Sequence, residues 1–201
     1  MQEKLTNRFS KELRENKMSR VEVITGPMFC GKSDELIRRL SRVIIAKREI
    51  QVFKPRIDDK DNLASHSGQE FEGRAVSGIQ EIKELLRPST EVVAIDGAHL
   101  FEEEIIPFVQ ELAEAGKRVI VAGLDTDFRF EPFGAMPKLI ATAEVVDKLP
   151  AICMVCGKNA TRTQRLVDGK PANYDDPVVV VGANEMYEAR CRMHHKVPKK
   201  R

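Results

Sequence analysis

No stretch of this sequence approaches the ~20 consecutive apolar residues that a membrane-spanning helix requires. Neither sign of charge is in large excess, because Lys and Arg number 33 and Asp and Glu number 31. Aromatic residues make up only 5% of the chain, whereas a nucleic-acid surface needs a basic face with interleaved aromatics. The first 20 residues are dense in charge and lack the apolar core of a signal peptide. We therefore expect a cytoplasmic protein with no membrane and no nucleic acid among its partners.

The rest of the composition is that of an ordinary globular protein. Apolar residues account for 42% and charged residues for 32%, and 201 residues are enough for one domain with a small appendage. Because the cytosol keeps thiols reduced, the four cysteines need an explanation other than disulfides. The basic segment 196–201 is short and is interpreted as a solvated tail.

The most informative motif is G-x-x-x-x-G-K-S, between an apolar run at 21–25 and a stretch with helical apolar spacing at 36–44. In this strand–loop–helix context the motif is the phosphate-binding P-loop. Its backbone N–H groups and the helix N-terminus face a polyphosphate, the lysine adds a full charge, and the serine hydroxyl offers a ligand to Mg²⁺. We predict that a nucleoside triphosphate is bound by Gly26, Pro27, Met28, Phe29, Cys30, Gly31, Lys32 and Ser33.

A second nucleotide motif follows the apolar run 92–95, where Asp96 ends a strand. A carboxylate at the end of that strand lies beside the P-loop and can hold Mg²⁺ directly or through water. An aspartate that merely ends a strand is common. It is the pairing with the P-loop that makes Asp96 a predicted ligand.

Strand and helix patterns alternate from residue 21 to residue 123. The runs 91–96 and 117–123 are typical of strands buried on both faces, 50–54 and 73–76 predict two more strands, and helices are expected at 79–86 and from about 102 to Gly116. This order predicts an α/β fold, a P-loop NTPase-like, mostly parallel sheet flanked by helices. We expect an N-terminal extension at 1–20, a P-loop ATP-binding domain at 21–149, a zinc-ribbon-like domain at 150–197 and a basic tail at 198–201.

The zinc expectation depends on Cys153-x-x-Cys156 and Cys191-x-x-His194. Two close ligand pairs separated by a long loop suit one tetrahedral zinc ion with a structural role. A redox Cys-x-x-Cys is the main alternative, but it leaves the second pair unexplained. His195 could replace His194 as the ligand.

The P-loop, the aspartate-ended strand and the cysteine pairs, in this order, resemble the type II thymidine kinases, the family that includes the cytosolic vertebrate enzyme and many bacterial ones. The resemblance extends over about residues 20–197. It is carried by the segments 26–33, 52–58, 65–68, 122–125, 131–134 and 182–191.

This resemblance implies transfer of the γ-phosphoryl group of ATP to the 5′-hydroxyl of thymidine or deoxyuridine, in nucleoside salvage for DNA synthesis, by a homotetramer. Phe128 and Tyr187 match residues that line the base and sugar, and Met28, Leu124 and Thr163 match residues around the thymine methyl group. A lasso-like loop that reads the base through its backbone matches Val178, Val179, Val180, Val181 and Gly182. Without the resemblance, 178–181 would be interpreted as a buried strand.

The chain departs from the family at the expected general base. Family members carry Asp-Glu after the apolar strand, and the Glu is taken as the base for the 5′-hydroxyl. Here Gly97 follows Asp96, so that position is vacant, and Asp58 or His99 is the possible substitute. The sequence leaves three hypotheses: a thymidine kinase with reduced turnover, a nucleotide-binding relative without turnover, and an unrelated P-loop ATPase with a nucleic-acid-binding zinc ribbon.

Overall fold

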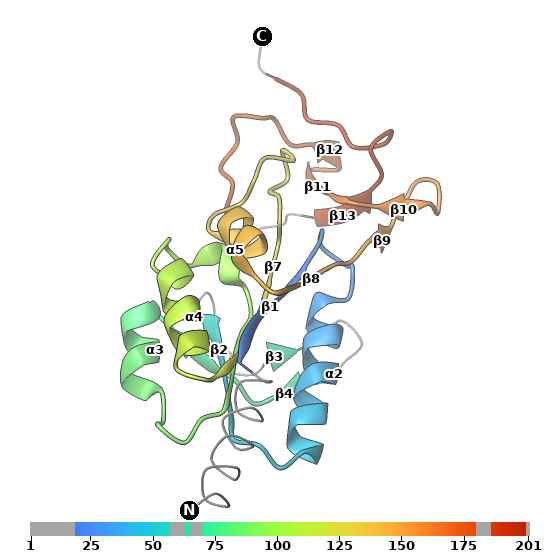
Figure 1. Cartoon of the computed structure of the whole chain (residues 1–201). Helices are drawn as coiled ribbons and strands as arrows, with labels where there is room; N and C mark the ends of the chain where they lie inside the picture. The colour runs from blue at the N-terminus through green and yellow to red at the C-terminus, as the bar shows by residue number, and fades with distance from the viewer. Residues whose placement is uncertain (1–18, 57–62, 65–69, 180–185, 200–201) are drawn as a thin grey trace, which may run out of the picture.

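The computed structural model of the chain describes residues 19–56, 63–64, 70–179 and 186–199. They form a large sheet with helices on both faces and, after residue 150, a group of short antiparallel strands (Figure 1). The strands of the large sheet are β1 (Arg20–Thr25), β2 (Ile50–Pro55), β5 (Arg74–Val76), β6 (Val92–Ile95), β7 (Arg118–Gly123) and β8 (Val145–Lys148). The helices are α2 (Lys32–Ile45), α3 (Ile79–Leu85), the 3₁₀ turn η1 (Ala98–Leu100), α4 (Ile105–Glu114) and α5 (Met136–Thr142). The short strands are β3 (Leu63–Ala64), β4 (Glu70–Phe71), β9 (Ala151–Ile152), β10 (Asn159–Ala160), β11 (Arg162–Val167), β12 (Lys170–Pro171) and β13 (Met186–Arg190).

All six strands of the large sheet run parallel, in the order β5-β2-β6-β7-β1-β8. β7 pairs with β1 from Arg118↔Arg20 onward and with β6 from Arg118↔Val92 onward. Every residue of β6 is buried, because helices cover both faces of the sheet. The predicted α/β fold with a mostly parallel sheet flanked by helices is confirmed. Its topology brings the C-terminal ends of β1, β6 and β7 together, which is where open parallel sheets bind ligands.

Helices cover the two faces of the sheet unequally (Figure 1). On one face, α2 buries Leu36, Leu40 and Val43 against the apolar side chains of the central strands. On the other face, α3, α4 and α5 build the larger cluster, with Ile105 and Met136 among its fully buried members. Apolar residues three and four positions apart place these side chains on one side of each helix.

The helix α4 begins and ends close to where the sequence predicts. Glu102, Glu103 and Glu104 precede its first residue, Ile105. Pro107 lies in the first turn, where its missing N–H has no partner to lose. Gly116 follows the helix with φ of 87°, a left-handed value that glycine adopts without strain.

The C-terminal strands form two small antiparallel sheets. β11 pairs with β13 from Arg162↔Arg190 to Leu166↔Met186 and with β12 on its other side, while β9 pairs with β10. A buried strand at 178–181 does not fit this arrangement, because Val179 lies outside every strand and is 52% exposed. Val180 and Val181 lie outside the described residues.

Among the strands of the large sheet and the α-helices, α5 and β8 have no counterpart in the sequence prediction, and neither do η1, β3 and β4. α5 has only seven residues and carries a proline in its first turn, which is too short for a helical repeat to stand out. β8 is an edge strand in which Val145 and Val146 remain exposed, so it lacks the apolar pattern of the buried strands. β8 extends the sheet next to β1, and α5 packs against β1.

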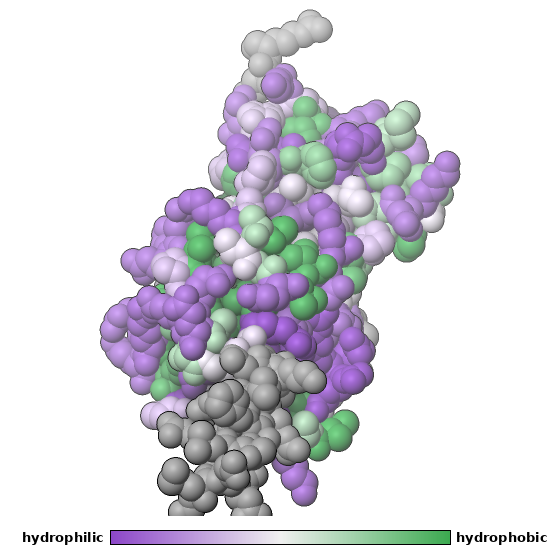
Figure 2. All heavy atoms as spheres, in the orientation of Figure 1, coloured by the Kyte–Doolittle hydropathy of each residue, from purple (hydrophilic) through white to green (hydrophobic). Residues whose placement is uncertain are grey.

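Hydrophilic residues cover most of the face shown in Figure 2, and hydrophobic residues gather across its middle, between the helices and the short C-terminal strands. Among the described residues, no helix is both long and apolar enough to span a bilayer.

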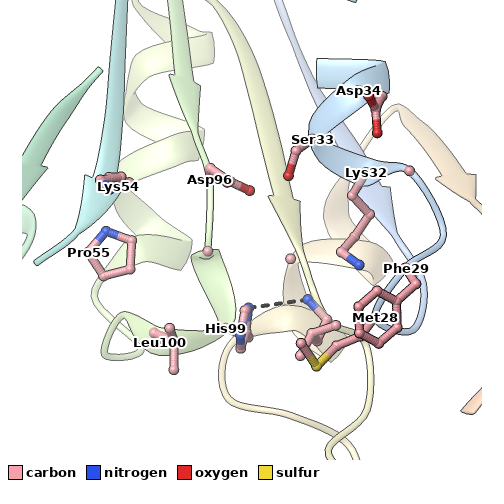
Figure 3. A pocket seen from close by; sticks show the side chains of 14 residues that line it. Met28, Phe29, Lys32, Ser33, Asp34, Lys54, Pro55, Asp96, His99 and Leu100 are labelled. Carbon is pink, nitrogen blue, oxygen red and sulfur yellow. Dashed lines mark hydrogen bonds between the residues drawn. The ribbon is translucent and has the colours of Figure 1, made fainter. Parts of the chain in front are cut away.

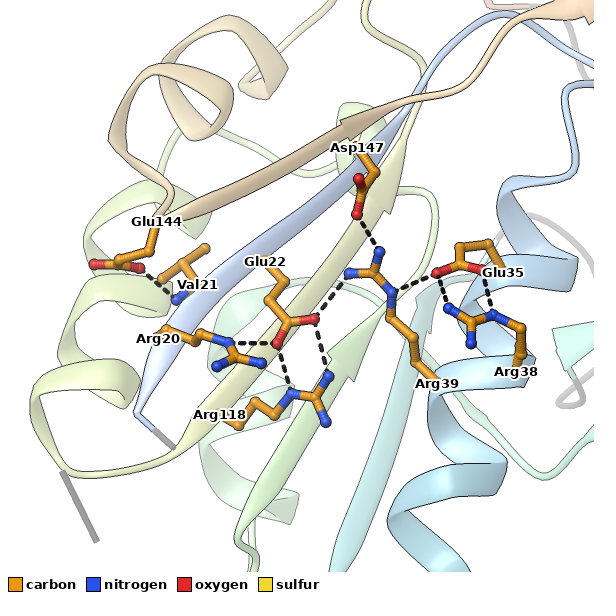
Figure 4. Close-up of polar contacts among 9 residues, drawn as sticks. All are labelled: Arg20, Val21, Glu22, Glu35, Arg38, Arg39, Arg118, Glu144 and Asp147. Carbon is orange, nitrogen blue, oxygen red and sulfur yellow. Dashed lines mark hydrogen bonds and ion pairs between the residues drawn. The ribbon is translucent and has the colours of Figure 1, made fainter. Parts of the chain in front are cut away.

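A network of charged side chains joins α2 to the sheet away from the P-loop (Figure 4). Glu22 of β1 has a side chain that is only 3% exposed, and its carboxylate pairs with Arg20, Arg39 and Arg118 at 2.6–2.8 Å. Arg39 extends the network, because it also pairs with Glu35 at 2.8 Å and with Asp147. The network ties α2 to β1, β7 and β8 at once.

Candidate active site and metal site

The loop between β1 and α2 has backbone positions that a Cβ would disturb. Gly26 has φ of 141°, and a Cβ there would lie 2.2 Å from the carbonyl oxygen of Leu149. Gly31, the residue before α2, has φ of 82°. Both values are costly for residues with a side chain. The two glycines of the motif are therefore needed for the turn itself.

Lys32 is the first residue of α2, and its side chain turns back so that the ammonium group lies against the loop. Its Nζ donates to the carbonyl oxygen of Pro27 at 2.6 Å and lies 3.5 Å from Sγ of Cys30. The helix behind it has 14 residues, so its N-terminus adds backbone N–H donors and a partial positive charge. Ser33 points across the pocket toward Asp96 (Figure 3). This arrangement suits a polyphosphate with a bound cation.

A cavity of about 360 Å³ lies at the C-terminal ends of β1, β2, β6 and β7. Five of the eight predicted P-loop residues line it together with groups from the other strands, whereas Gly26, Pro27 and Cys30 are not among its lining residues (Figure 3). The lining residues are Met28, Phe29, Gly31, Lys32, Ser33, Asp34, Lys54, Pro55, Asp96, Gly97, His99, Leu100, Gly123 and Leu124.

Asp96 lies directly after β6, as the sequence predicts, and faces this cavity. Burial raises the pKa of its carboxyl group, while the N–H of Gly97 and the charges of Lys32 and Lys54 oppose that rise. Burial therefore disfavours the ionised carboxylate, and the neighbouring cations favour it. A divalent cation bound here would favour the ionised form further.

Gly97 also takes a left-handed backbone, with φ of 66°. A Cβ at this position would lie 3.0 Å from both Cδ and Cγ of Pro55. The site therefore strains any residue with a side chain. Gly97 leaves the expected base position without a side chain, and glycine is also the residue that adopts this backbone conformation with the least strain.

His99 lines this cavity and is largely buried. Its Nδ1 accepts a hydrogen bond from the N–H of Leu124 at 3.2 Å, and its ring is tilted against Phe133 with centroids 4.8 Å apart. Burial, followed by the charge of Lys32, lowers the pKa of His99 to about 3. The imidazole is therefore neutral near pH 7, with its proton on Nε2, because Nδ1 is the acceptor. Such a group is a weak base and a good donor.

A second, smaller cavity of about 190 Å³ adjoins the first. Four residues, Met28, His99, Leu100 and Leu124, line both cavities and form their common wall. The other lining residues come from the loop after β7 and from the C-terminal strands and loops: Asp127, Phe128, Phe133, Thr163, Val178, Val179 and Tyr187.

Most of the residues that the resemblance assigns to substrate lie around this second cavity. Met28, Leu124, Phe128, Thr163, Val178, Val179 and Tyr187 all line it. Asp58, Val180, Val181 and Gly182 lie outside the described residues, as does the segment 65–68. The sequence analysis did not single out Lys54, Leu100, Asp127 or Phe133, although Lys54 and Phe133 fall within segments that carry the resemblance.

Thr163 connects the C-terminal strands to the P-loop. Its Oγ1 accepts a hydrogen bond from the backbone N–H of Met28 at 3.0 Å, and only 2% of the residue is exposed. Cys30 packs on the same side, against the small cluster of Ala151, Cys153, Ala160 and Ala189. The phosphate loop is thus supported by the C-terminal module as well as by the sheet.

Four side chains of this module, those of Cys153, Cys156, Cys191 and His194, converge on one point, with all ligand atoms within 4.8 Å of one another. Sγ of Cys153 lies 3.7 Å and Sγ of Cys191 lies 3.3 Å from Nδ1 of His194. Burial raises the pKa of Cys153, but hydrogen bonds from backbone N–H groups and from His194 outweigh it and bring the pKa to about 5. The four residues could hold a metal ion, and three thiols with one imidazole fit structural zinc.

His195 is engaged elsewhere. Its Nε2 lies 2.8 Å from the carbonyl oxygen of Phe128, and it can donate a hydrogen bond to that oxygen. The geometry therefore favours His194 over His195 as the fourth ligand. The structure also brings all four predicted ligands into one cluster. A redox Cys-x-x-Cys would need only the first two cysteines, so the cluster favours a metal site over the redox alternative.

The fold, the P-loop and the cysteine–histidine cluster agree with a comparison of the chain with models of protein families. The model described as thymidine kinase matches residues 19–195, a range that includes the P-loop, both cavities and the metal cluster. The match covers most of the sequence and implies the kinase chemistry of nucleoside salvage. The chain therefore belongs to the thymidine kinase family.

Proposed function

We propose that this protein transfers the γ-phosphoryl group of ATP to the 5′-hydroxyl of thymidine or deoxyuridine. The observation that carries the proposal is the common wall of the two cavities, formed by Met28, His99, Leu100 and Leu124. One cavity holds the phosphate loop, and the other is lined mainly by apolar and aromatic side chains. A donor phosphate and an acceptor hydroxyl can meet at that wall.

At the ATP end, Lys32 and the N-terminus of α2 neutralise the β- and γ-phosphates. Ser33 and, directly or through water, Asp96 would hold the cation of an ATP·Mg²⁺ complex, since the two side chains face each other in Figure 3. Binding of the triphosphate releases Lys32 from the carbonyl oxygen of Pro27.

At the nucleoside end, Phe128 and Tyr187 provide the aromatic walls, and Met28 and Leu124 face the thymine methyl group. One methyl group changes binding by only ~1–3 kcal/mol, so deoxyuridine remains a substrate. The hydroxyl of Thr163 accepts a hydrogen bond from the N–H of Met28, so this threonine links the cavity around the thymine methyl group to the P-loop.

The reaction needs a nucleophilic 5′-oxygen that forms a bond to the γ-phosphorus while the bond to ADP breaks. Gly97 offers no side chain to take the hydroxyl proton, and the neutral His99 is a weak base. We assign the base to Asp58, and give His99 the role of a donor through Nε2–H to a developing negative charge. Phosphoryl transfer depends mainly on positioning and charge neutralisation. The protein can therefore still turn over without a glutamate at residue 97, although we expect a reduced rate.

The test is a kinase assay on the purified protein with ATP, Mg²⁺ and thymidine, following both ADP and thymidine monophosphate. We expect equal amounts of the two products, loss of both in Lys32→Ala, and little product from cytidine or purine nucleosides. ADP release that does not respond to thymidine would contradict the proposal. Binding of thymidine without any product would favour the nucleotide-binding relative without turnover.

A further inference from the structure

An arginine that no motif singles out lies behind the wall of the smaller cavity. Arg165 is in β11 and is only 3% exposed. Its guanidinium carbon lies 5.3 Å from the centroid of the Phe128 ring. Its Nη1 donates a hydrogen bond to the carbonyl oxygen of Pro177. One side chain thus contacts two segments that are almost fifty residues apart in sequence.

The strand geometry explains why Arg165 lies there. Thr163 and Arg165 are two positions apart in β11, so their side chains share one face of the small sheet. Arg165 is paired with Tyr187 of β13, and Thr163 is paired with Ala189. Side chains of directly paired residues lie on the same face. Because Thr163 and Tyr187 both line the smaller cavity, Arg165 projects toward its walls from the same side.

The two segments that Arg165 contacts are two different walls of that cavity. Phe128 is 3% exposed and comes from the loop that follows β7. Pro177 directly precedes Val178 and Val179, which also line the cavity but come from a different segment. His195 supports the first wall from the same module by contacting the carbonyl oxygen of Phe128. The width of the cavity therefore depends on side chains that do not line it.

A guanidinium group suits this position better than an ammonium group. Its flat face stacks on an aromatic ring while the N–H groups in its plane reach a carbonyl oxygen. A lysine can keep the positive charge near the ring, but it cannot satisfy both contacts with the same fixed geometry.

Building on the proposed function, we infer that Arg165 is a positioning residue for the nucleoside. It holds Phe128 and the segment 177–179 at the separation that a pyrimidine nucleoside requires. The phosphate loop has its own link to the same strand, through Thr163 and Met28. Loss of the Arg165 side chain should therefore weaken nucleoside binding and leave ATP binding intact.

The chain offers a matched control three residues away. Arg162 is also in β11 and also stacks on an aromatic ring, with its guanidinium carbon 3.8 Å from the centroid of Phe130. Phe130, unlike Phe128, is not among the described residues that line the smaller cavity. Removal of Arg162 deletes a similar contact between the module and the loop after β7 without touching a wall of the cavity.

The experiment compares the wild type with Arg165→Met, Arg165→Lys and Arg162→Met, all in the full chain with its metal content measured. Dissociation constants for thymidine and for ATP are determined separately by calorimetry, so that slow turnover does not matter. We expect Arg165→Met to weaken thymidine binding about tenfold or more, since a stacked cation and a hydrogen bond are lost together. ATP binding should stay within about twofold of the wild type. The thymidine dissociation constant of Arg165→Lys should lie between those of the wild type and Arg165→Met. Arg162→Met should match the wild type in its dissociation constants for both ligands.

A folded Arg165→Met protein with its metal and with unchanged thymidine affinity would overturn the inference, as would an equal loss of thymidine and ATP affinity. If Arg165→Met fails to fold, Arg165→Lys decides by the same ratio of the two dissociation constants. A wild type that binds ATP but no thymidine would instead reject the proposed function, so the two failures are distinguishable.

Discussion

At the scale of single residues, the end of β6 determines what the larger cavity can do. Asp96 supplies a carboxylate beside the P-loop, and the next residue, Gly97, supplies only a backbone with φ of 66°. Pro55 packs so closely that a Cβ at residue 97 would meet it at 3.0 Å. A carboxylate here would thus restore the expected base and strain the turn at the same time.

These two effects can be separated by comparing Gly97→Glu with Gly97→Ala. Both substitutions carry the strain of a left-handed residue, which costs about 1–2 kcal/mol of stability. The carboxylate itself should raise kcat relative to Gly97→Ala by ~10² or more, with little change in KM, because a base acts mainly in the transition state. The check is steady-state kinetics on the two variants, with thermal melting as the control for strain. Equal kcat values would contradict this expected gain and would mean that Asp58 already serves as an effective base.

Lys32 offers a second prediction at this scale. Its ammonium group is the P-loop charge that lines the larger cavity, and on the proposed function it binds the phosphates, so Lys32→Ala should weaken ATP binding by at least about tenfold. Lys138→Ala is the control, because that lysine forms an exposed pair with Glu103 outside the cavity. Calorimetry with ATP measures both. Unchanged ATP affinity in Lys32→Ala would show that the P-loop assignment is wrong.

At the scale of elements, α2 is anchored at two places. Its N-terminus closes the phosphate loop, and its middle joins the sheet through Arg39 and the carboxylate of Glu22. Burial raises the pKa of Glu22, but hydrogen bonds and charges from Arg118 and Arg20 more than offset this and bring it to about 2. The helix that carries the P-loop lysine is therefore held by ion pairs that acid can break.

The pH dependence of stability follows from that shift. A carboxyl group with a folded pKa of about 2 and an ordinary value of 4.5 stabilises the fold fully above pH 4.5 and loses this contribution as the pH falls toward 2. The contribution is about 3 kcal/mol. Glu22→Gln should remove it, flatten that part of the profile, and cost about 3–5 kcal/mol at neutral pH because buried arginines lose a partner. Urea unfolding between pH 2 and 7 measures the change.

An exposed pair provides the control for this prediction. Glu91 and Arg48 form a 2.8 Å ion pair in which both side chains are more than a third exposed. Pairs of this kind contribute about 1 kcal/mol or less. Glu91→Gln should therefore leave the acid profile nearly unchanged, and a similar loss in both variants would contradict the special role of the buried network.

At the scale of the whole molecule, the sequence predicts the parallel sheet better than it predicts the C-terminal module. Strands β6 and β7 are apolar runs because both of their faces are covered, β1 follows this pattern apart from the buried Glu22, and the pattern is local. β11 is different, since Gln164 and Arg165 are buried at 1% and 3% exposure. Their partners, such as the backbone of Lys196 and the ring of Phe128, are distant in sequence, so no local pattern reveals the strand.

The candidate site divides along the same line. The P-loop could be predicted because its chemistry lies in eight consecutive residues that one turn requires. The walls of the smaller cavity could be predicted only through the resemblance, because Phe128, Thr163 and Tyr187 meet across three separate segments. The domain boundaries, the homotetramer and the cytoplasmic location remain predictions. Light scattering of the purified protein would measure its oligomeric state and so test the homotetramer.

The metal cluster gives the last prediction, which concerns how the C-terminal module supports the rest of the molecule. We expect one zinc ion per chain, lost in His194→Ala and kept in His195→Ala, because only His194 faces the cysteines. A module of short strands with a small core depends on such an ion. Its removal by a chelator should therefore release Thr163 and Tyr187, and abolish thymidine binding before the parallel sheet unfolds. Elemental analysis, calorimetry and circular dichroism on the same samples test this order of events. If zinc is retained in His194→Ala and lost in His195→Ala, the ligand assignment is wrong, and if chelation leaves thymidine binding intact, the module does not support the nucleoside cavity.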